Sequence, residues 1–101
     1  MVTTWPKDFP GLGTSANRLA EKINRASGGQ IKIKVFGSGE LVPAYEAFDA
    51  VRNGTADMCH DSPYYWLSKH PATVFFSTLP SGLNSCEQTS WLLYGGGNKL
   101  W

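Results

Sequence analysis

The sequence predicts an α/β fold: a three-layer arrangement in βαβαβ order with a mainly parallel sheet. Short apolar runs alternate with amphipathic helical patterns along the chain, and Gly- or Pro-containing breaks separate them. Strands that alternate with helices imply right-handed crossovers and a sheet covered by helices. A length of 101 residues suits one domain, so we expect a single domain over residues 1–101.

The first strand and helix are predicted within the first thirty or so residues. Val2–Trp5 is suited to a buried strand, and the Pro- and Gly-containing loop Pro6–Gly13 follows it. Thr14 or Ser15 is expected to cap the helix, and Ser27-Gly28-Gly29 is expected to end it, because Gly favours the left-handed conformation after a helix. The 3,4 spacing predicts one apolar face for this helix, made of Ala16, Leu19, Ala20 and Ile23.

A second strand and helix follow. Apolar and polar residues alternate over Gln30–Phe36, which predicts a strand with one wet face. Its lysines point to water and would protect the strand at a sheet edge. After the turn Gly37-Ser38-Gly39, a helix with Pro43 near its first position is expected to end at Asn53-Gly54. Its expected buried stripe consists of Leu41, Tyr45, Phe48 and Val51.

The remaining predicted elements are two strands and one helix. Ala56–His60 and Thr73–Leu79 are short strand-like runs. The last helix is expected to begin at Asn84 or Ser85, since Ser85 and Gln88 have the spacing of a capping box, and to end at Gly95-Gly96-Gly97.

Composition excludes several classes of protein. Hydrophobic residues make up 42% of the chain and charged residues 17%, as in ordinary globular proteins, and a net charge of +1 without a basic stripe disfavours nucleic-acid binding. No signal peptide is recognisable, because Met1–Trp5 begins directly in strand-like residues. Either the chain is cytoplasmic or a leader has been removed. Cys59 and Cys86 form no CxxC pair and leave the compartment undecided.

Gly11, Gly13 and Ala16 match the dinucleotide-binding fingerprint G-x-G-x-x-A between a strand and a helix. The surroundings disagree with that function. Pro6 and Pro10 replace a tight turn, and the second predicted strand ends without an acid for a ribose. We expect no cofactor, although the helix N-terminus remains suited to a carboxylate.

Cys59, His60 and Asp61 resemble a nucleophile, a base and an orienting acid. Consecutive strand residues point to opposite faces, so these three are not expected to converge as a catalytic triad. Together with His70 and Cys86 they show no zinc-ligand spacing. The sequence therefore predicts neither a catalytic residue nor a metal site, and no enzymatic activity.

The aromatic run Tyr64-Tyr65-Trp66 is the strongest candidate for a binding site. It follows the Ala56–His60 strand and the turn Asp61-Ser62-Pro63. Open α/β sheets place ligand contacts in loops at the carboxyl ends of their strands, and tyrosine hydroxyls suit the polar end of a small molecule. The alternative is that these rings pack beneath a loop.

Several motifs occur together along nearly the whole chain: TWPKDFPGLG at residues 4–13, GGQIKIKV at 28–35, GELVPA at 39–44, FDAV at 48–51, GTADM at 54–58, YYW at 64–66 and KHP at 69–71. With these motifs the chain resembles the extracytoplasmic solute-binding subunits of TRAP transporters, the DctP-type family. The similarity is greatest to the branch that handles 2-oxo acids and related carboxylates.

This resemblance implies a two-lobed, periplasmic-binding-protein-like fold that closes over its ligand. Residues 1–101 would be the N-terminal part of lobe one, a partial lobe, in a periplasmic and non-enzymatic protein. The ligand would be a small organic carboxylate, and TRAP membrane subunits would be partners of the full-length protein only. The residues implied to bind the ligand are Trp5, Phe9, Tyr64, Tyr65 and Trp66. The family's carboxylate-clamping Arg and its metal-holding residues belong to later segments.

Three departures from the family pattern leave the ligand's identity open. Asp61-Ser62-Pro63 is more polar than expected before the paired tyrosines, Cys59 replaces a small residue, and Ser81 replaces an aromatic.

Two functions therefore compete. In the first, the chain is a fragment of a solute-binding protein, with weak or no ligand binding by itself. In the second, it is a truncated, self-associating interaction module, in which the end Trp91–Trp101 pairs with a second copy as a homo-oligomer, for example by domain swapping. Light scattering distinguishes the two, because a strict monomer at high concentration contradicts the module.

Overall fold

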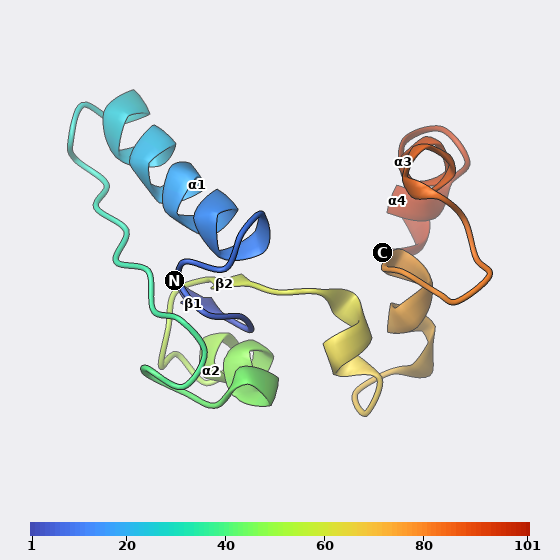
Figure 1. Ribbon diagram of the computed structural model, residues 1–101, viewed down its shortest axis with the longest axis horizontal. Coiled ribbons are helices and arrows are strands. Elements are labelled where there is room, and N and C mark those ends of the chain that lie inside the picture. Colours follow the sequence, from blue (N-terminus) through green and yellow to red (C-terminus); the bar gives the residue numbers. More distant parts are fainter. The chain divides into compact units, whose positions relative to one another are not determined.

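The computed structural model describes residues 1–101, which form two compact units, Met1–Asp61 and Ser62–Trp101 (Figure 1). The first unit contains the sheet, and all the buried hydrophobic side chains of the chain belong to it. The second unit is helical. No helix in either unit combines the length and the apolar character needed to cross a membrane.

The first unit is built around a small parallel sheet. β1 (Val2–Thr3) pairs with β2 (Cys59–His60), so that Val2 lies opposite Cys59 and Thr3 opposite His60. Phe36 makes a parallel bridge to Val2 on the other edge of β1. The parallel direction and the helices between the strands confirm the α/β class. Both strands are shorter than predicted, because β1 already ends at Thr3 and β2 begins only at Cys59.

The predicted strand Gln30–Phe36 is only partly confirmed. The segment is extended, but its ladder pairing is confined to Phe36, whose N–H donates to the Met1 carbonyl at 2.9 Å. The Lys34 carbonyl also accepts a hydrogen bond from the Met1 amino group at 2.9 Å. The strand β1, which lies next to this segment, is short, so the residues before Lys34 pair with no strand and run beside the first helix (Figure 1).

Helix α1 (Leu12–Ala26) starts earlier than predicted. Its N-cap is Gly11, at φ 82°, where a side chain at Cβ would strain the backbone. The hydroxyl of Thr14 accepts the Gly11 N–H at 3.1 Å, so Thr14 supports the cap from inside the helix instead of forming it. The predicted end is confirmed, with Ser27 as the C-cap and left-handed glycines after it. On the predicted apolar face, Ala16 and Ala20 are buried, Ile23 is half-buried and Leu19 is exposed.

The second predicted helix is shorter and begins with a tighter turn. A 3₁₀ helix over Ala44–Glu46 leads into α2 (Ala47–Arg52), and Asn53 caps the end as predicted. The first half of the predicted buried stripe is wrong, because Leu41 precedes the helix and Tyr45 is 73% exposed. The buried side chains are the small Ala47 and Ala50. Phe48 and Val51 are half-buried, and small residues let the helix lie close to the sheet.

The three layers of the first unit follow from strand alternation. Met1 packs in one cluster with Ala16, Ala20 and Val35, on the side of α1. Val2, the next residue, packs with Ala47 and Ala50 on the side of α2. Consecutive strand residues point to opposite faces, so one short strand supports both helical layers. Figure 1 shows α1 and α2 on opposite sides of β1 and β2.

The second unit contains two 3₁₀ helices, Pro63–Trp66 and Pro71–Phe76, followed by α3 (Ser85–Leu93) and α4 (Gly97–Leu100). The predicted strand Thr73–Leu79 is therefore wrong. Local hydrogen bonds override the β-propensity of this run, because the His70 ring accepts the Ala72 N–H at 3.2 Å and the Thr73 hydroxyl donates to the His70 carbonyl at 2.7 Å. Pro71 at the helix start is also preset for a helical turn.

Helix α3 begins where predicted, but a different pair of residues forms its capping box. Asn84 is the N-cap and accepts the N–H groups of Cys86 and Glu87 at 3.0 Å, while the Glu87 carboxylate accepts the Asn84 N–H at 2.8 Å. The capping box is thus Asn84 with Glu87, one residue before the predicted Ser85 with Gln88. The glycines after α3 end it as predicted.

Candidate functional site

The candidate site in the first unit begins where β1 ends. Trp5 follows the strand by two residues and is 6% exposed. The Thr3 hydroxyl donates to its carbonyl at 2.7 Å, and the Ser38 N–H donates to the same carbonyl at 3.0 Å. Two donors from different segments hold the backbone of Trp5, so the indole is fixed at the carboxyl end of the strand.

The end of β2 supplies the neighbours of this indole. The rings of Trp5 and His60 lie edge-to-face, with centroids 5.0 Å apart and planes at 88°. Beside them, the Thr4 hydroxyl donates to the Asp61 carboxylate. The carboxyl ends of the two parallel strands therefore bring together Thr4, Trp5, His60 and Asp61. We call these four residues the strand-end cluster.

Two buried nitrogens of the strand-end cluster have no hydrogen-bond partner, the indole Nε1 of Trp5 and the Nδ1 of His60. An indole N–H only donates, whereas a neutral imidazole also offers an acceptor nitrogen. Buried polar atoms without partners cost free energy, and they gather at functional sites more than elsewhere. The cluster is thus polar and incompletely satisfied, with Thr4 and Trp5 buried and His60 and Asp61 half-buried.

Burial sets the protonation of this cluster. Removal from water lowers the pKa of His60, and the negative charge of Asp61 opposes part of that effect. His60 is consequently neutral at pH 7. Burial also raises the pKa of the Cys59 thiol, with Asp61 adding to the effect. Cys59 packs on the other face, with the cluster of Val2, Ala47 and Ala50. Cys59 and His60 therefore lie on opposite faces of β2, as expected for consecutive strand residues.

The pKa of His60 makes stability depend on pH. Unfolded His60 takes up a proton near its ordinary pKa of 6.5, whereas the folded chain takes it up only at lower pH. Between these two values the unfolded chain binds more protons, so stability rises with pH. We expect the urea midpoint to fall when the pH is lowered from 7.5 to 5, and His60→Gln to reduce that slope. An unchanged slope in this variant, with His70→Gln as the control, would contradict the assignment.

The loop after Trp5 is held by two close glycines. The Gly13 N–H donates to the Phe9 carbonyl at 2.9 Å, and a Cβ on Gly13 would lie 2.3 Å from the Pro6 carbonyl oxygen. A Cβ on Gly37 would lie 2.8 Å from the Lys7 nitrogen. The backbone of Pro6 and Lys7 thus passes through a gap that only glycines leave open. Phe9, at the end of this loop, is 48% exposed.

The predicted aromatic run lies in the second unit, in the 3₁₀ helix Pro63–Trp66. The rings of Tyr64 and Tyr65 lie together, with centroids 4.3 Å apart. Tyr64 is the more exposed of the two. Trp66 turns to a different neighbour, since its ring lies 5.7 Å from that of Trp101. The two tyrosines therefore suit ligand contact better than Trp66 does.

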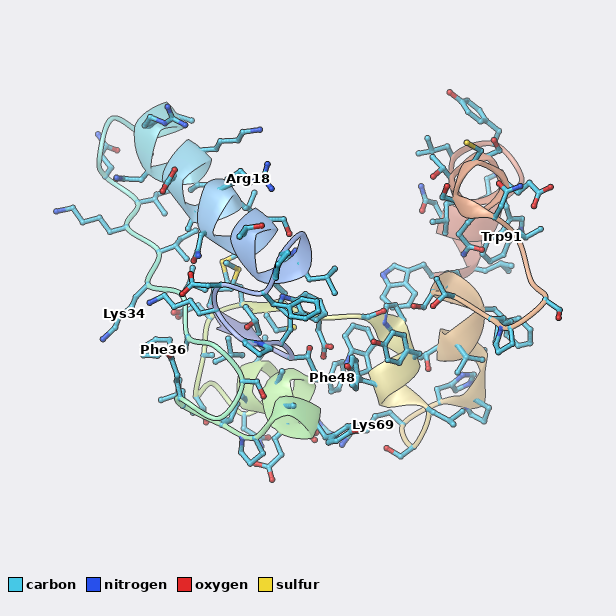
Figure 2. All side chains as sticks on the ribbon, in the orientation of Figure 1. Arg18, Lys34, Phe36, Phe48, Lys69 and Trp91 are labelled. Carbon is cyan, nitrogen blue, oxygen red and sulfur yellow. The ribbon has the colours of Figure 1, made fainter.

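Apolar hollows mark the rest of the second unit. One of about 300 Å³ is lined by Phe75, Leu79, Leu83 and Trp91, with Ser77 and Gln88 at its edge. Another of about 350 Å³ lies between Phe76, Trp91 and Leu100. Figure 2 shows Trp91 on α3. Trp91 and Trp101 both contact the ring of Phe76, at centroid distances of 5.3 and 5.0 Å. The end of the chain thus makes ring contacts within its unit, although Trp101 is 62% exposed and no element was predicted there.

The structure describes the five predicted site residues within their own units. Trp5 and Phe9 lie on the first unit, and Tyr64, Tyr65 and Trp66 on the second. Their role in ligand binding stays a prediction. No group of three or more His, Cys, Asp or Glu side chains is arranged to hold a metal ion.

Sequence reasoning missed Thr4, His60 and Asp61 as neighbours of Trp5. It treated His60 and Asp61 only as a possible triad and dismissed them. Their positions just after two predicted strands were a usable signal, because parallel strands end at the same edge of a sheet.

Parallel strands with helices on both faces, and aromatic residues after the strand ends, define the class of α/β ligand-binding lobes. Comparison with known proteins makes this specific. Residues 1–100 match the family described as bacterial extracellular solute-binding protein, family 7 (DctP). The chain belongs to this family, which is one of solute-binding proteins of TRAP transporters and not of enzymes.

Three relatives illustrate the similarity. A monocarboxylate 2-oxoacid-binding periplasmic protein of Nostoc sp. (strain PCC 7120) is 45% identical over an alignment of 100 residues, and the match covers 96% of this chain and 26% of that protein. The crystal structure of a TRAP transporter solute binding protein from Bordetella bronchiseptica RB50, with copurified calcium and picolinate in its active site, is 35% identical with a TM-score of 0.91. A TRAP periplasmic solute binding protein from Colwellia psychrerythraea, with bound calcium and pyruvate, is 35% identical with a TM-score of 0.90.

Both structural matches cover 98% of this chain and 30% of the other. The chain therefore spans between a quarter and a third of the length of the relatives it matches. The predicted family and the predicted fold class are confirmed.

Proposed function

We propose that residues 1–101 form the first part of lobe one of a solute-binding protein that captures small 2-oxo carboxylates for TRAP transport in the periplasm. The observation that carries the proposal is the fixed position of Trp5 at the carboxyl ends of two paired parallel strands. Ligands of open α/β folds bind at that edge. The 45% identity to the Nostoc 2-oxoacid-binding protein supports the ligand class.

In this proposal, the ligand contacts Trp5 and Phe9 of the first unit and Tyr64, Tyr65 and Trp66 of the second. We call these five residues the aromatic wall. Aromatic rings bury the carbon skeleton of a small acid, and tyrosine hydroxyls donate to its polar end. The charge that neutralises the carboxylate comes from an Arg of the family outside these residues, through a paired hydrogen bond. No bond is made or broken, so the protein is a carrier.

This proposal predicts weak binding by the 101-residue chain itself. One wall without its charged counterpart supplies few contacts, and most of their energy is lost to immobilising the ligand. We expect isothermal titration calorimetry with pyruvate to detect no tight binding. A micromolar dissociation constant for the isolated chain would contradict the requirement for a second wall.

A hybrid protein tests the aromatic wall directly. The part of this chain that matches the Nostoc protein, 96% of its length, would replace the matched segment of that protein. We expect this hybrid to bind pyruvate and Tyr64→Ala or Tyr65→Ala to weaken binding about tenfold or more, as for central contacts of an interface. Tyr94→Ala is the matched control, because Tyr94 is 87% exposed on the far end of α3. Unchanged affinity for pyruvate in both test variants, with circular dichroism showing a folded hybrid, would refute the role of Tyr64 and Tyr65 in ligand binding.

Self-association is the second candidate function, and apolar exposure favours it. Leu93, Tyr94 and Leu100 are all more than half exposed near the end of the second unit. Exposed apolar patches of this kind usually meet another surface. Trp101 is 62% exposed but contacts Phe76 within the same unit, so this contact would have to break before the element could exchange. Light scattering at high concentration decides whether a dimer forms.

A further inference from the structure

The extended segment Ile31–Val35 is an edge of the first unit that is open at Ile33 and Val35, since the Ile31 N–H already donates to the Ser27 hydroxyl at 3.0 Å. In extended backbone, the N–H and C=O groups of alternate residues point to the same side. Lys34 and Phe36 direct their groups towards Met1 and Thr3, through bonds of 2.9 to 3.0 Å. The groups of Ile33 and Val35 therefore point away from β1. Neither residue makes a backbone hydrogen bond in the structure.

Unpaired backbone groups in extended geometry are a template for another strand. The segment is held in place from the inside, because the Val35 side chain is buried with Ala16 and Ala20 of α1 and Ile33 packs against that cluster. An incoming strand would thus meet an edge that is already ordered. This lowers the conformational cost of pairing.

Positive charge surrounds this edge. A groove of about 540 Å³ lies between α1 and the segment, lined by Lys7, Lys32 and Lys34 together with Asn17, Asn24 and Glu21. The ammonium of Lys34 lies 4.8 Å from the centre of the Phe36 ring (Figure 2). None of the three lysines has an ion-pair partner in the chain. Val35 and Ile33 face α1, so the side chains of Lys32 and Lys34 lie on the opposite face of the segment, as the position of Lys34 over Phe36 shows. Counted over both faces, three lysines and one glutamate give this edge a net positive charge.

The positive charge of this edge indicates which kind of partner would bind there. A second copy pairing along the same edge would bring the lysines of both copies together, and like charges facing each other disfavour that arrangement. An extended segment with alternating carboxylates would instead neutralise them. We propose that the edge Ile31–Val35 binds an extended acidic segment of a partner protein by strand addition. The backbones of Ile33 and Val35 supply the hydrogen bonds, and Lys7, Lys32 and Lys34 supply the selectivity.

This proposal is independent of the carboxylate site, because the edge lies on the opposite margin of β1 from the strand-end cluster. Its test uses the 101-residue chain with the peptide acetyl-Glu-Val-Glu-Val-Glu-amide as the probe. We expect the peptide to shift the NMR signals of the Ile33 and Val35 amides and to slow their hydrogen exchange. The lysine analogue of the peptide should not bind, and added salt should weaken the acidic peptide because the charges are exposed.

Matched variants make the test specific. Lys32→Glu is expected to weaken peptide binding about tenfold, as charge reversal at the rim of an interface does. Lys22→Glu changes the net charge equally but lies on another groove of α1, with Ser15 and Leu19, and should leave binding unchanged. Ile33→Pro removes one outward donor and should abolish strand addition. If Ile33→Pro does not fold, the lysine variants and the amide signals still test whether the peptide binds at this edge.

Three results would overturn the proposal: equal binding of acidic and basic peptides, equal effects of Lys32→Glu and Lys22→Glu, or peptide-induced shifts confined to the second unit. Pairing of two copies through this edge, seen as a dimer in sedimentation with Ile33 protected, would overturn it as well.

Discussion

Trp5→Ala is expected to destabilise the first unit by about 3 to 5 kcal/mol, the usual cost of removing a buried tryptophan side chain. The indole is 6% exposed and contacts His60, so its loss leaves a cavity at the carboxyl ends of β1 and β2. Urea unfolding followed by far-UV circular dichroism measures the change without relying on tryptophan fluorescence. In the pyruvate-binding hybrid, the same substitution should also remove detectable binding.

Trp5→Phe separates packing from hydrogen bonding. A phenyl ring keeps most of the contact with His60 and removes only an indole N–H that has no partner. Removing a buried donor without a partner also removes its desolvation cost. We therefore expect Trp5→Phe to cost less than half as much as Trp5→Ala. Equal losses in the two variants would mean that the indole N–H has an important partner, contrary to this structure.

Gly13→Ala is expected to destabilise the first unit by about 3 kcal/mol, because the added methyl group has no space. Its Cβ would lie 2.3 Å from the Pro6 carbonyl and 2.6 Å from the Lys7 carbonyl, and both are backbone atoms that cannot rotate away. The loop that follows Trp5 would have to move. Hybrid affinity for pyruvate should fall even at temperatures where the variant stays folded.

Gly11→Ala is the matched control for Gly13→Ala. Gly11 has φ 82°, but nothing lies within 4 Å of an added Cβ. At φ 82° and ψ −74°, its substitution costs only backbone strain, about 1 to 3 kcal/mol, without a steric clash. If thermal unfolding ranks Gly11→Ala as the more damaging change, the close approach of Pro6 and Lys7 to α1 is wrong.

Local sequence patterns correctly predicted the helix boundaries that depend on residues a few positions away. The ends of α1 and α2, the start of α3 and the stop after it all follow from glycine, asparagine or capping residues within a few positions. The errors occurred where two local signals competed. At Pro71–Phe76 a proline and two side-chain hydrogen bonds outweighed β-branched and aromatic residues, and a 3₁₀ helix replaced the predicted strand.

The candidate site was predicted in kind but not in composition. Aromatic residues after strand ends indicated ligand contacts, and the family resemblance singled out Trp5, Phe9, Tyr64, Tyr65 and Trp66. The contact of Trp5 with His60 was missed, because 55 positions separate these residues and nothing in the local pattern of either one points to the other. The packing of Trp66 on Trp101 was missed for the same reason.

From its sequence alone, this protein is an α/β chain of the DctP type whose alternating runs and glycine breaks set the order of its strands and helices. These properties depend on neighbours a few residues apart. Tertiary packing settled how far each strand extends, which small residues let the helices approach the sheet, and which side chains meet at the strand ends. It also left the Ile31–Val35 edge open beside unpaired lysines. Such features depend on hydrogen bonds and contacts between distant segments, and no local pattern encodes them.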